Sequence, residues 1–198
     1  MTPITLATLR KTPEQLLAMR DELKELQGAL AVGDASVLDR HKLVMEQIRE
    51  LKESFVAQRD ALSTTLPDGR RLFPGQYKAL EKFASNNKLD VQKLFSKITI
   101  EGGVVVECDF ERLGLTTLEG LERLQRIRAL NVRHNEDLTS LKGIPTKALE
   151  ILEARGCGLT GDYTFLSKAP NLSDLHLEHS PNLTLDKSKF NGSVTIYV

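Results

Sequence analysis

Long apolar runs, cysteine and net charge are all scarce in this 198-residue sequence. No tract reaches the ~18 consecutive apolar residues of a membrane-spanning helix, and the opening residues MTPITLATLRKT hold too short an apolar run for a secretory signal. We therefore expect a soluble, cytoplasmic protein, with export by a signal-independent route left open. Basic and acidic side chains number 27 each, which argues against a strongly basic nucleic-acid-binding domain.

One spacing of apolar residues recurs through the second half of the sequence. The segment from Ile127 to Leu138, IRALNVRHNEDL, reads I-x-x-L-x-V-x-x-N-x-x-L. The same spacing returns from Leu149 and again, after a nearly equal interval, from Leu172. A degenerate copy precedes them at Val105, and Ile196 with Val198 supplies a last strand. In each copy, apolar residues two positions apart would point to one side of a short strand.

Residues 104–198 therefore resemble the leucine-rich-repeat family, whose repeats are about 20 to 29 residues long. The segment from Leu138 to Pro145, LTSLKGIP, is similar to the convex side of bacterial members. The resemblance implies an α+β fold with a short solenoid of parallel strands. Within it, Asn135 suits a buried amide that binds turn backbone. Cys108 and Cys157 occupy inward positions, so we expect two reduced packing thiols instead of a disulfide.

Residues 65–103 are predicted to form a linker and then a cap, made of helices and a β-hairpin, over the open end of the repeat core. Helical spacing covers Gln76–Ser85, and Asp90 is a candidate cap for a second, shorter helix. Strand-like alternation from Ile98 to Val106, broken by two glycines, predicts the β-hairpin. In the first repeat, leucines at spacings of three predict a convex-side helix; they are Leu118, Leu121 and Leu124.

Residues 13–64 are predicted to form an antiparallel helical hairpin or coiled coil, after a flexible N-terminus at residues 1–12. Thr12 and Pro13 suit a helix start, and Gly33 with Asp34 suits a break between helices of about 13–32 and 35–64. An apolar stripe with alternating spacings of three and four is our candidate for self-association or for docking another helix. Its members are Leu16, Met19, Leu23, Leu26, Leu30, Val44, Ile48, Leu51, Phe55 and Leu62. Further apolar residues widen the surface beyond a two-helix seam, so a partner is needed; they are Leu17, Leu38, Leu43 and Met45.

Strand residues that alternate with the inward ones are predicted to face the concave surface of the repeats. The candidate partner-binding residues are Asp109, Asn131, Arg133, Glu153, Arg155, Asp174, His176, Glu178 and Tyr197. Acidic side chains would lie at the edges of this face, with Arg133 and Arg155 at its centre. Such a face suits a polar protein or peptide partner.

Other chemistries find weaker signals in the sequence. His176 and His179 would diverge on a strand and its turn, and no cysteine pair completes a metal-ligand set, so we predict no metal and no cofactor. The sequence contains no phosphate-binding or nucleophile-elbow motif, so we predict no enzyme. The basic segment 70–97 could hold an anionic ligand or nucleic acid, but Tyr77 and Phe83 share the apolar side of their helix and are better placed as core.

The sequence thus predicts a non-catalytic protein–protein interaction module. A protein or peptide would bind the concave face of the repeats, and the helical hairpin would self-associate or dock another helix. The competing hypothesis is a purely structural assembly unit, in which both regions contact further copies of the same chain.

Overall fold

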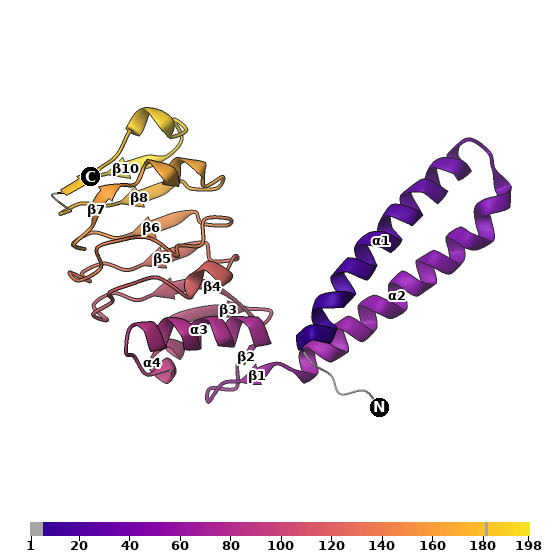
Figure 1. Cartoon of the computed structure of the whole chain (residues 1–198), viewed down its shortest axis with the longest axis horizontal. Helices are drawn as coiled ribbons and strands as arrows, with labels where there is room; N and C mark the ends of the chain where they lie inside the picture. The colour runs from indigo at the N-terminus through magenta and orange to yellow at the C-terminus, as the bar shows by residue number, and fades with distance from the viewer. Residues whose placement is uncertain (1–5, 181) are drawn as a thin grey trace. The chain divides into compact units, whose positions relative to one another are not determined.

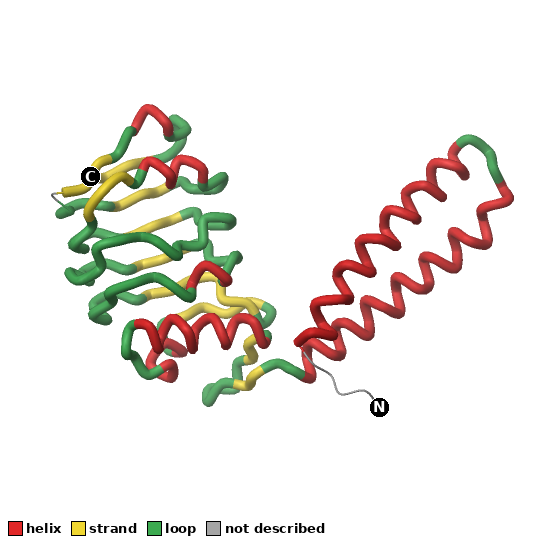
Figure 2. Tube along the Cα trace, viewed as in Figure 1, coloured by secondary structure: helices red, strands yellow, loops and turns green. Residues whose placement is uncertain are grey.

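The computed structural model describes residues 6–180 and 182–198, and it shows an α+β protein in which helices precede a mostly parallel sheet (Figure 1). Helices, strands and the long connections between strands are distinguished in Figure 2. The chain divides into two compact units, residues 1–63 and residues 64–198. Within the described residues, each helix is too short or too polar to span a lipid bilayer.

The first unit is an antiparallel helical hairpin (Figure 1). Its elements are helix α1 (Leu6–Ala31), the 3₁₀ turn η1 (Ala35–Val37) and helix α2 (Leu38–Ala61). Gly33 ends the first helix in the left-handed region, with a φ of 89°. The side chain of Asp34 accepts a hydrogen bond of 3.0 Å from the backbone N–H of Ser36. The predicted break between the helices is therefore confirmed.

The predicted start of the first helix is wrong. The sequence favours a cap at Thr12 and a first turn at Pro13, whereas α1 begins at Leu6 and contains Pro13. Proline removes one backbone N–H from the helix, and a helix that continues on both sides can tolerate that loss. The second helix ends at Ala61, before the predicted residue 64. Residues 1–5 of the expected flexible N-terminus lie outside the described residues.

The predicted apolar stripe lies along the seam of the hairpin. Val44 and Ile48 are buried, and the other eight stripe residues are half-buried while most of their neighbours are exposed. The stripe is therefore used, at least in part, to hold α1 against α2. Among the hairpin residues whose side chains are described, six large apolar ones remain exposed, namely Leu17, Val32, Leu38, Leu43, Met45 and Val56.

The second unit begins with a small hairpin and two helices. Its first elements are β1 (Thr64–Thr65), β2 (Arg71–Leu72), α3 (Pro74–Asn86) and α4 (Val91–Phe95). The Asp90 carboxylate accepts a hydrogen bond of 2.9 Å from the backbone of Gln92, so it caps α4 as predicted. The β1–β2 pair was not predicted, because such short strands leave no periodicity in a sequence.

A six-stranded sheet forms the body of this unit, in the order β10-β8-β6-β5-β4-β3. Its strands are β3 (Ile98–Glu101), β4 (Val104–Asp109), β5 (Ala129–Asn131), β6 (Ile151–Glu153), β8 (Asp174–His176) and β10 (Thr195–Tyr197). The strands β3 and β4 are antiparallel, which confirms the predicted β-hairpin, and the remaining pairs are parallel. Leu130 pairs in register with Cys108 on one side and Leu152 on the other, as the recurring spacing predicts.

Long connections return each strand to the same end of the sheet. They hold a second, two-stranded parallel sheet and three 3₁₀ turns: β7 (Thr160–Asp162), β9 (Asn182–Thr184), η2 (Leu121–Arg123), η3 (Thr164–Lys168) and η4 (Lys187–Lys189). The predicted helix around Leu121 is wrong, because only the η2 turn forms there. Gly120, with a φ of 115°, breaks the pattern, and a Cβ on it would lie 2.6 Å from the backbone nitrogen of Phe83 in α3. The leucines are buried as expected, but a helix would not fit so close to α3.

The turns that follow the strands stack on one another. Arg112, His134, Gly156 and His179 all have left-handed backbones, with φ between 54° and 68°. Beside them, the amide of Asn135 is 1% exposed, accepts hydrogen bonds from the backbone of Leu113 and Leu115, and donates to the carbonyls of Phe110 and Val132. The predicted inward amide is confirmed, and it ties one turn to the next.

Candidate functional site

The exposed face of the six-stranded sheet gathers the predicted partner-binding residues. Asn131 pairs in register with Asp109 and with Glu153, and His176 pairs with Glu153 and with Tyr197. These side chains alternate with buried ones, so they form one row across five strands. We use the name polar face for the surface made by this row (Asp109, Asn131, Glu153, His176 and Tyr197) and by the outward-facing residues on either side of it.

A second row continues into the turns beyond the strands. The backbone N–H of Arg112 donates to the carbonyl of Arg133, that of His134 to Arg155, and that of Gly156 to Glu178. The stacking of the strands therefore persists there, and it places the side chains of Glu111, Arg133, Arg155 and Glu178 next to the first row. The structure thus brings the residues predicted from the sequence onto one surface. Asp174 lies on the side of the first row that is opposite to the turns, where it pairs with Ile151.

Arg133 is engaged by its neighbours within the polar face. Its guanidinium donates to Glu111 at 2.8 Å and lies 3.6 Å from a carboxylate oxygen of Glu153. The hydrogen bond from Arg133 lowers the pKa of Glu111 below its ordinary value of 4.5, and the same bond raises the pKa of Arg133. Arg155, by contrast, forms no ion pair among the described residues. Of the two central arginines, Arg155 is the more available to a partner.

His176 is held between acidic and aromatic neighbours. Its ring nitrogens lie 3.9 Å from Glu153 and 3.6 Å from Glu178. The ring stacks on that of Tyr197, with centroids 4.2 Å apart and planes 10° from parallel. Tyr197 itself is 45% exposed, so this aromatic pair offers a flat surface on the last strand of the sheet.

The charge on the polar face is more negative than its arginines suggest. Six carboxylates belong to it, from Glu107, Asp109, Glu111, Glu153, Asp174 and Glu178, against the two guanidinium groups of Arg133 and Arg155 and the ammonium group of Lys97. Since Arg133 is already shared by Glu111 and Glu153, it leaves little positive charge for a ligand. The sequence predicts arginines at the centre of the face, and the structure shows that acidic groups dominate it.

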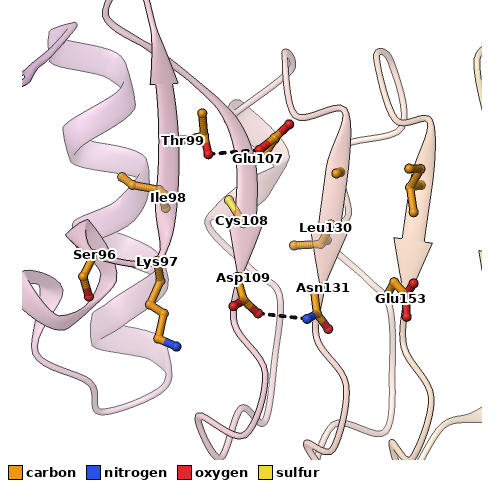
Figure 3. Close-up of a pocket in the computed structure, with 12 residues that line it drawn as sticks. Ser96, Lys97, Ile98, Thr99, Glu107, Cys108, Asp109, Leu130, Asn131 and Glu153 are labelled. Atoms are coloured by element: carbon orange, nitrogen blue, oxygen red, sulfur yellow. Dashed lines mark hydrogen bonds between the residues drawn. The ribbon is translucent and has the colours of Figure 1, made fainter.

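A hollow of about 310 Å³ opens on this face over β3 to β6 (Figure 3). Ala129 lies between Glu107 and Ile151 in adjacent strands, and its small side chain leaves the space. Three lining residues are acidic, Glu107, Asp109 and Glu153, and Lys97 is basic. Sequence reasoning missed this hollow, although a small alanine between two larger residues in one row was a signal that could have located it.

The remaining chemical groups are engaged in the interior. Cys108 and Cys157 are free and buried, as predicted, and burial raises the pKa of both thiols. In the basic segment 70–97, Phe83 is buried and Tyr77 packs against the core, which confirms where the sequence places them. Arg70 donates to the backbone carbonyls of Ile98 and Phe95. Across the described residues, no three His, Cys, Asp or Glu side chains are grouped in a way that could hold a metal ion.

Comparison of the chain with protein-family models, with curated proteins and with solved structures gave no match.

Proposed function

We propose that residues 104–198 form a short leucine-rich-repeat domain whose polar face binds a protein or peptide partner without catalysing a reaction. The observation that carries the proposal is the register of the sheet. Units of nearly equal length add one parallel strand each, so that polar side chains line up on an exposed face over a buried apolar row. In this reading the elements from α3 to β3 cap the repeats, and the polar face is their concave side.

The chemistry of the face favours a macromolecular partner over a small substrate. Its polar groups are spread over five parallel strands and are not gathered in one enclosed cavity. An extended surface with exposed Ile151 and Tyr197 among charged side chains has the mixed character of a protein interface. Both thiols are buried with raised pKa values, which disfavours a nucleophilic role for either.

Site-specific photo-crosslinking in the full chain tests this proposal. A photoreactive amino acid replaces Ile151, which is 37% exposed on the polar face, or Phe165, which is 43% exposed in η3, outside the sheet. In the cells that make the protein, we expect a discrete crosslinked species from position 151 and none from position 165. Equal crosslinking from both positions, or none from position 151, would overturn the proposal.

Self-association through the hairpin is a second candidate function, and a specific observation favours it. In the described part of residues 1–63, Val44 and Ile48 are the buried apolar residues, while six large apolar side chains are exposed. A pair of helices with so little interior gains stability by covering those side chains, for example in a four-helix bundle of two chains. The stripe predicted from the sequence then holds each hairpin together, and the exposed residues beside it contact the second copy.

Light scattering on the full chain distinguishes a self-associating hairpin from a monomeric one. We expect a mass at least twice the 22.1 kDa of one chain. The double variant Leu38→Lys/Met45→Lys places charge on exposed α2 positions and should return the mass to that of one chain. Phe165→Lys, which changes an equally exposed side chain in the second unit, should leave it unchanged. A monomeric wild-type chain would contradict this candidate function.

A further inference from the structure

We propose that the hollow on the polar face receives a basic side chain, arginine above all, of the bound protein or peptide. The inference rests on the proposed partner-binding role of this face and adds the chemistry of the partner to it. Three observations support it: the size of the hollow, its apolar floor, and two carboxylates beside that floor, which are not in ion pairs with other described residues.

The size of the hollow suits one inserted side chain. Its volume of about 310 Å³ lies at the lower end of the ~300–1,000 Å³ range of ligand pockets. The floor is apolar, because Ala129 and Ile151 face the same side of adjacent strands. A long basic side chain could lay its methylene groups on this floor and keep its charged end at the polar margin, as arginine and lysine do elsewhere on protein surfaces.

Two carboxylates beside the floor keep acceptor capacity for that charged end. Glu107 accepts a hydrogen bond of 3.0 Å from the hydroxyl of Thr99, and Asp109 accepts one of 2.8 Å from the amide of Asn131 (Figure 3). Both donors are neutral and bind one oxygen of each carboxylate. Neither carboxylate is in an ion pair among the described residues, although Asp109 is close enough to Arg133 for a long-range electrostatic attraction. These hydrogen bonds fix the two groups in place without neutralising them.

A guanidinium fits this arrangement better than a metal ion or an anion. Its planar fork can donate to two carboxylate oxygens at once, and it is less strongly hydrated than an ammonium group. A metal ion would need ligands that converge, and the described residues offer no such group. An anion would meet Glu107, Asp109 and Glu153 with only Lys97 in its favour. The carboxylates of Asp174 and Glu178 extend the acidic character along the face, so a partner with several basic residues is favoured.

Nuclear magnetic resonance of the full chain with two blocked tripeptides tests the proposal. The probe is acetyl-Gly-Arg-Gly-amide, and its control is the same peptide with citrulline, which keeps the shape of arginine and lacks its charge. We expect the arginine peptide to shift the backbone signals of Asp109, Ala129 and Ile151, and to bind at least fivefold more tightly than the citrulline peptide. Equal binding of the two peptides, or shifts confined to other residues, would overturn the proposal.

Variants separate the role of charge from that of space. Asp109→Asn and Glu107→Gln should each weaken arginine binding about two- to fivefold, the range expected for one exposed ion pair. Ala129→Leu fills the floor of the hollow and should abolish binding of the arginine peptide. Thr195→Leu makes a similar change in β10, in the same row of the sheet but outside the hollow, and should leave that binding unchanged. Asp174→Asn is the matched charge control and should change the affinity less than 1.5-fold. Retained binding in Ala129→Leu would contradict the proposal.

The two proposals can fail separately. If position 151 crosslinks to a partner but the arginine peptide shows no preference over citrulline, the face binds proteins and the basic-side-chain inference is wrong. If position 151 yields no crosslink in cells, the proposed function fails, whatever the tripeptides do in the isolated protein.

Discussion

The hairpin unit and the sheet unit bury their apolar residues to very different extents. In the sheet unit Phe83 and Phe110 have no exposed surface and stack with ring centroids 5.1 Å apart, within a continuous core. In the described part of the hairpin unit only Val44 and Ile48 are buried. Each inner strand of the sheet has a neighbouring strand on both sides, whereas two helices can cover only one side of each other. This difference predicts that the sheet unit is stable alone and that the hairpin gains stability from further contacts.

The largest expected effect comes from removing the amide that links two turns of the sheet unit. Asn135→Ala leaves the backbone N–H groups of Leu113 and Leu115 and the carbonyl of Phe110 without their partner, and the carbonyl of Val132 keeps only the thiol of Cys157. Each such loss in a buried site costs about 1–3 kcal/mol, so we expect destabilisation of at least about 3 kcal/mol. Amide hydrogen exchange followed by mass spectrometry should show faster exchange across β4 to β6 and unchanged exchange in α1 and α2.

A matched control separates the buried amide from a general effect of losing asparagine. Asn182 is exposed in β9, and Asn182→Ala should change the stability by less than about 0.5 kcal/mol. Faster exchange in the hairpin of the Asn135→Ala protein would show that the two units unfold together, and the contrast between them would then be wrong.

A smaller effect is expected from the reverse experiment, in which the hairpin loses part of its seam. Ile48 is 9% exposed, and Ile48→Ala should destabilise the hairpin by about 2 kcal/mol. Hydrogen exchange in α1 and α2 should accelerate, while exchange in the sheet unit stays at the wild-type rate. Val56→Ala, at a 42% exposed position of the same helix, should have a clearly smaller effect if the hairpin stands alone. An effect as large as that of Ile48→Ala would show that Val56 is covered by a second copy.

The sequence was sufficient for features that depend on local spacing. Alternation along the strands predicted which residues share the polar face, because side chains in a strand point to opposite sides in turn. The nearly constant interval between copies of the apolar pattern predicted the parallel register, and Gly33 with Asp34 predicted the break between the helices. These features follow from backbone geometry, which a single sequence can encode within a few residues.

Features that depend on contacts between distant residues escaped prediction. The turn at Gly120 is shaped by α3, which lies much earlier in the chain. The hydrogen bond from Arg133 to Glu111 depends on side-chain conformations in neighbouring turns, whereas the ion pair of Arg133 with Glu153 is expected from their positions on adjacent strands. The left-handed backbones of Arg112, His134 and His179 were missed as well, because among the four equivalent turn positions only Gly156 is a glycine, the residue that favours this conformation. The hollow over Ala129 escaped prediction because its shape depends on the register of β3 to β6 and also on the conformations of the side chains that line it.

The smallest expected effect concerns the acid stability of the sheet unit. Because the hydrogen bond from Arg133 lowers the pKa of Glu111, the native state favours the ionised carboxylate more than the unfolded chain does. The resulting stabilisation is fully present above the ordinary value of 4.5 and is lost as the pH falls through the lowered value of the native state. Wild-type protein should therefore be more stable than Glu111→Gln at neutral pH, and the difference should disappear between about pH 5 and pH 3. Hydrogen exchange or thermal unfolding at a series of pH values measures this difference, with Glu136→Gln, at an exposed glutamate outside any ion pair of the described residues, as the control. If Glu136→Gln shows the same pH dependence, the effect belongs to the overall charge of the unit, and the bond between Arg133 and Glu111 contributes nothing specific to it.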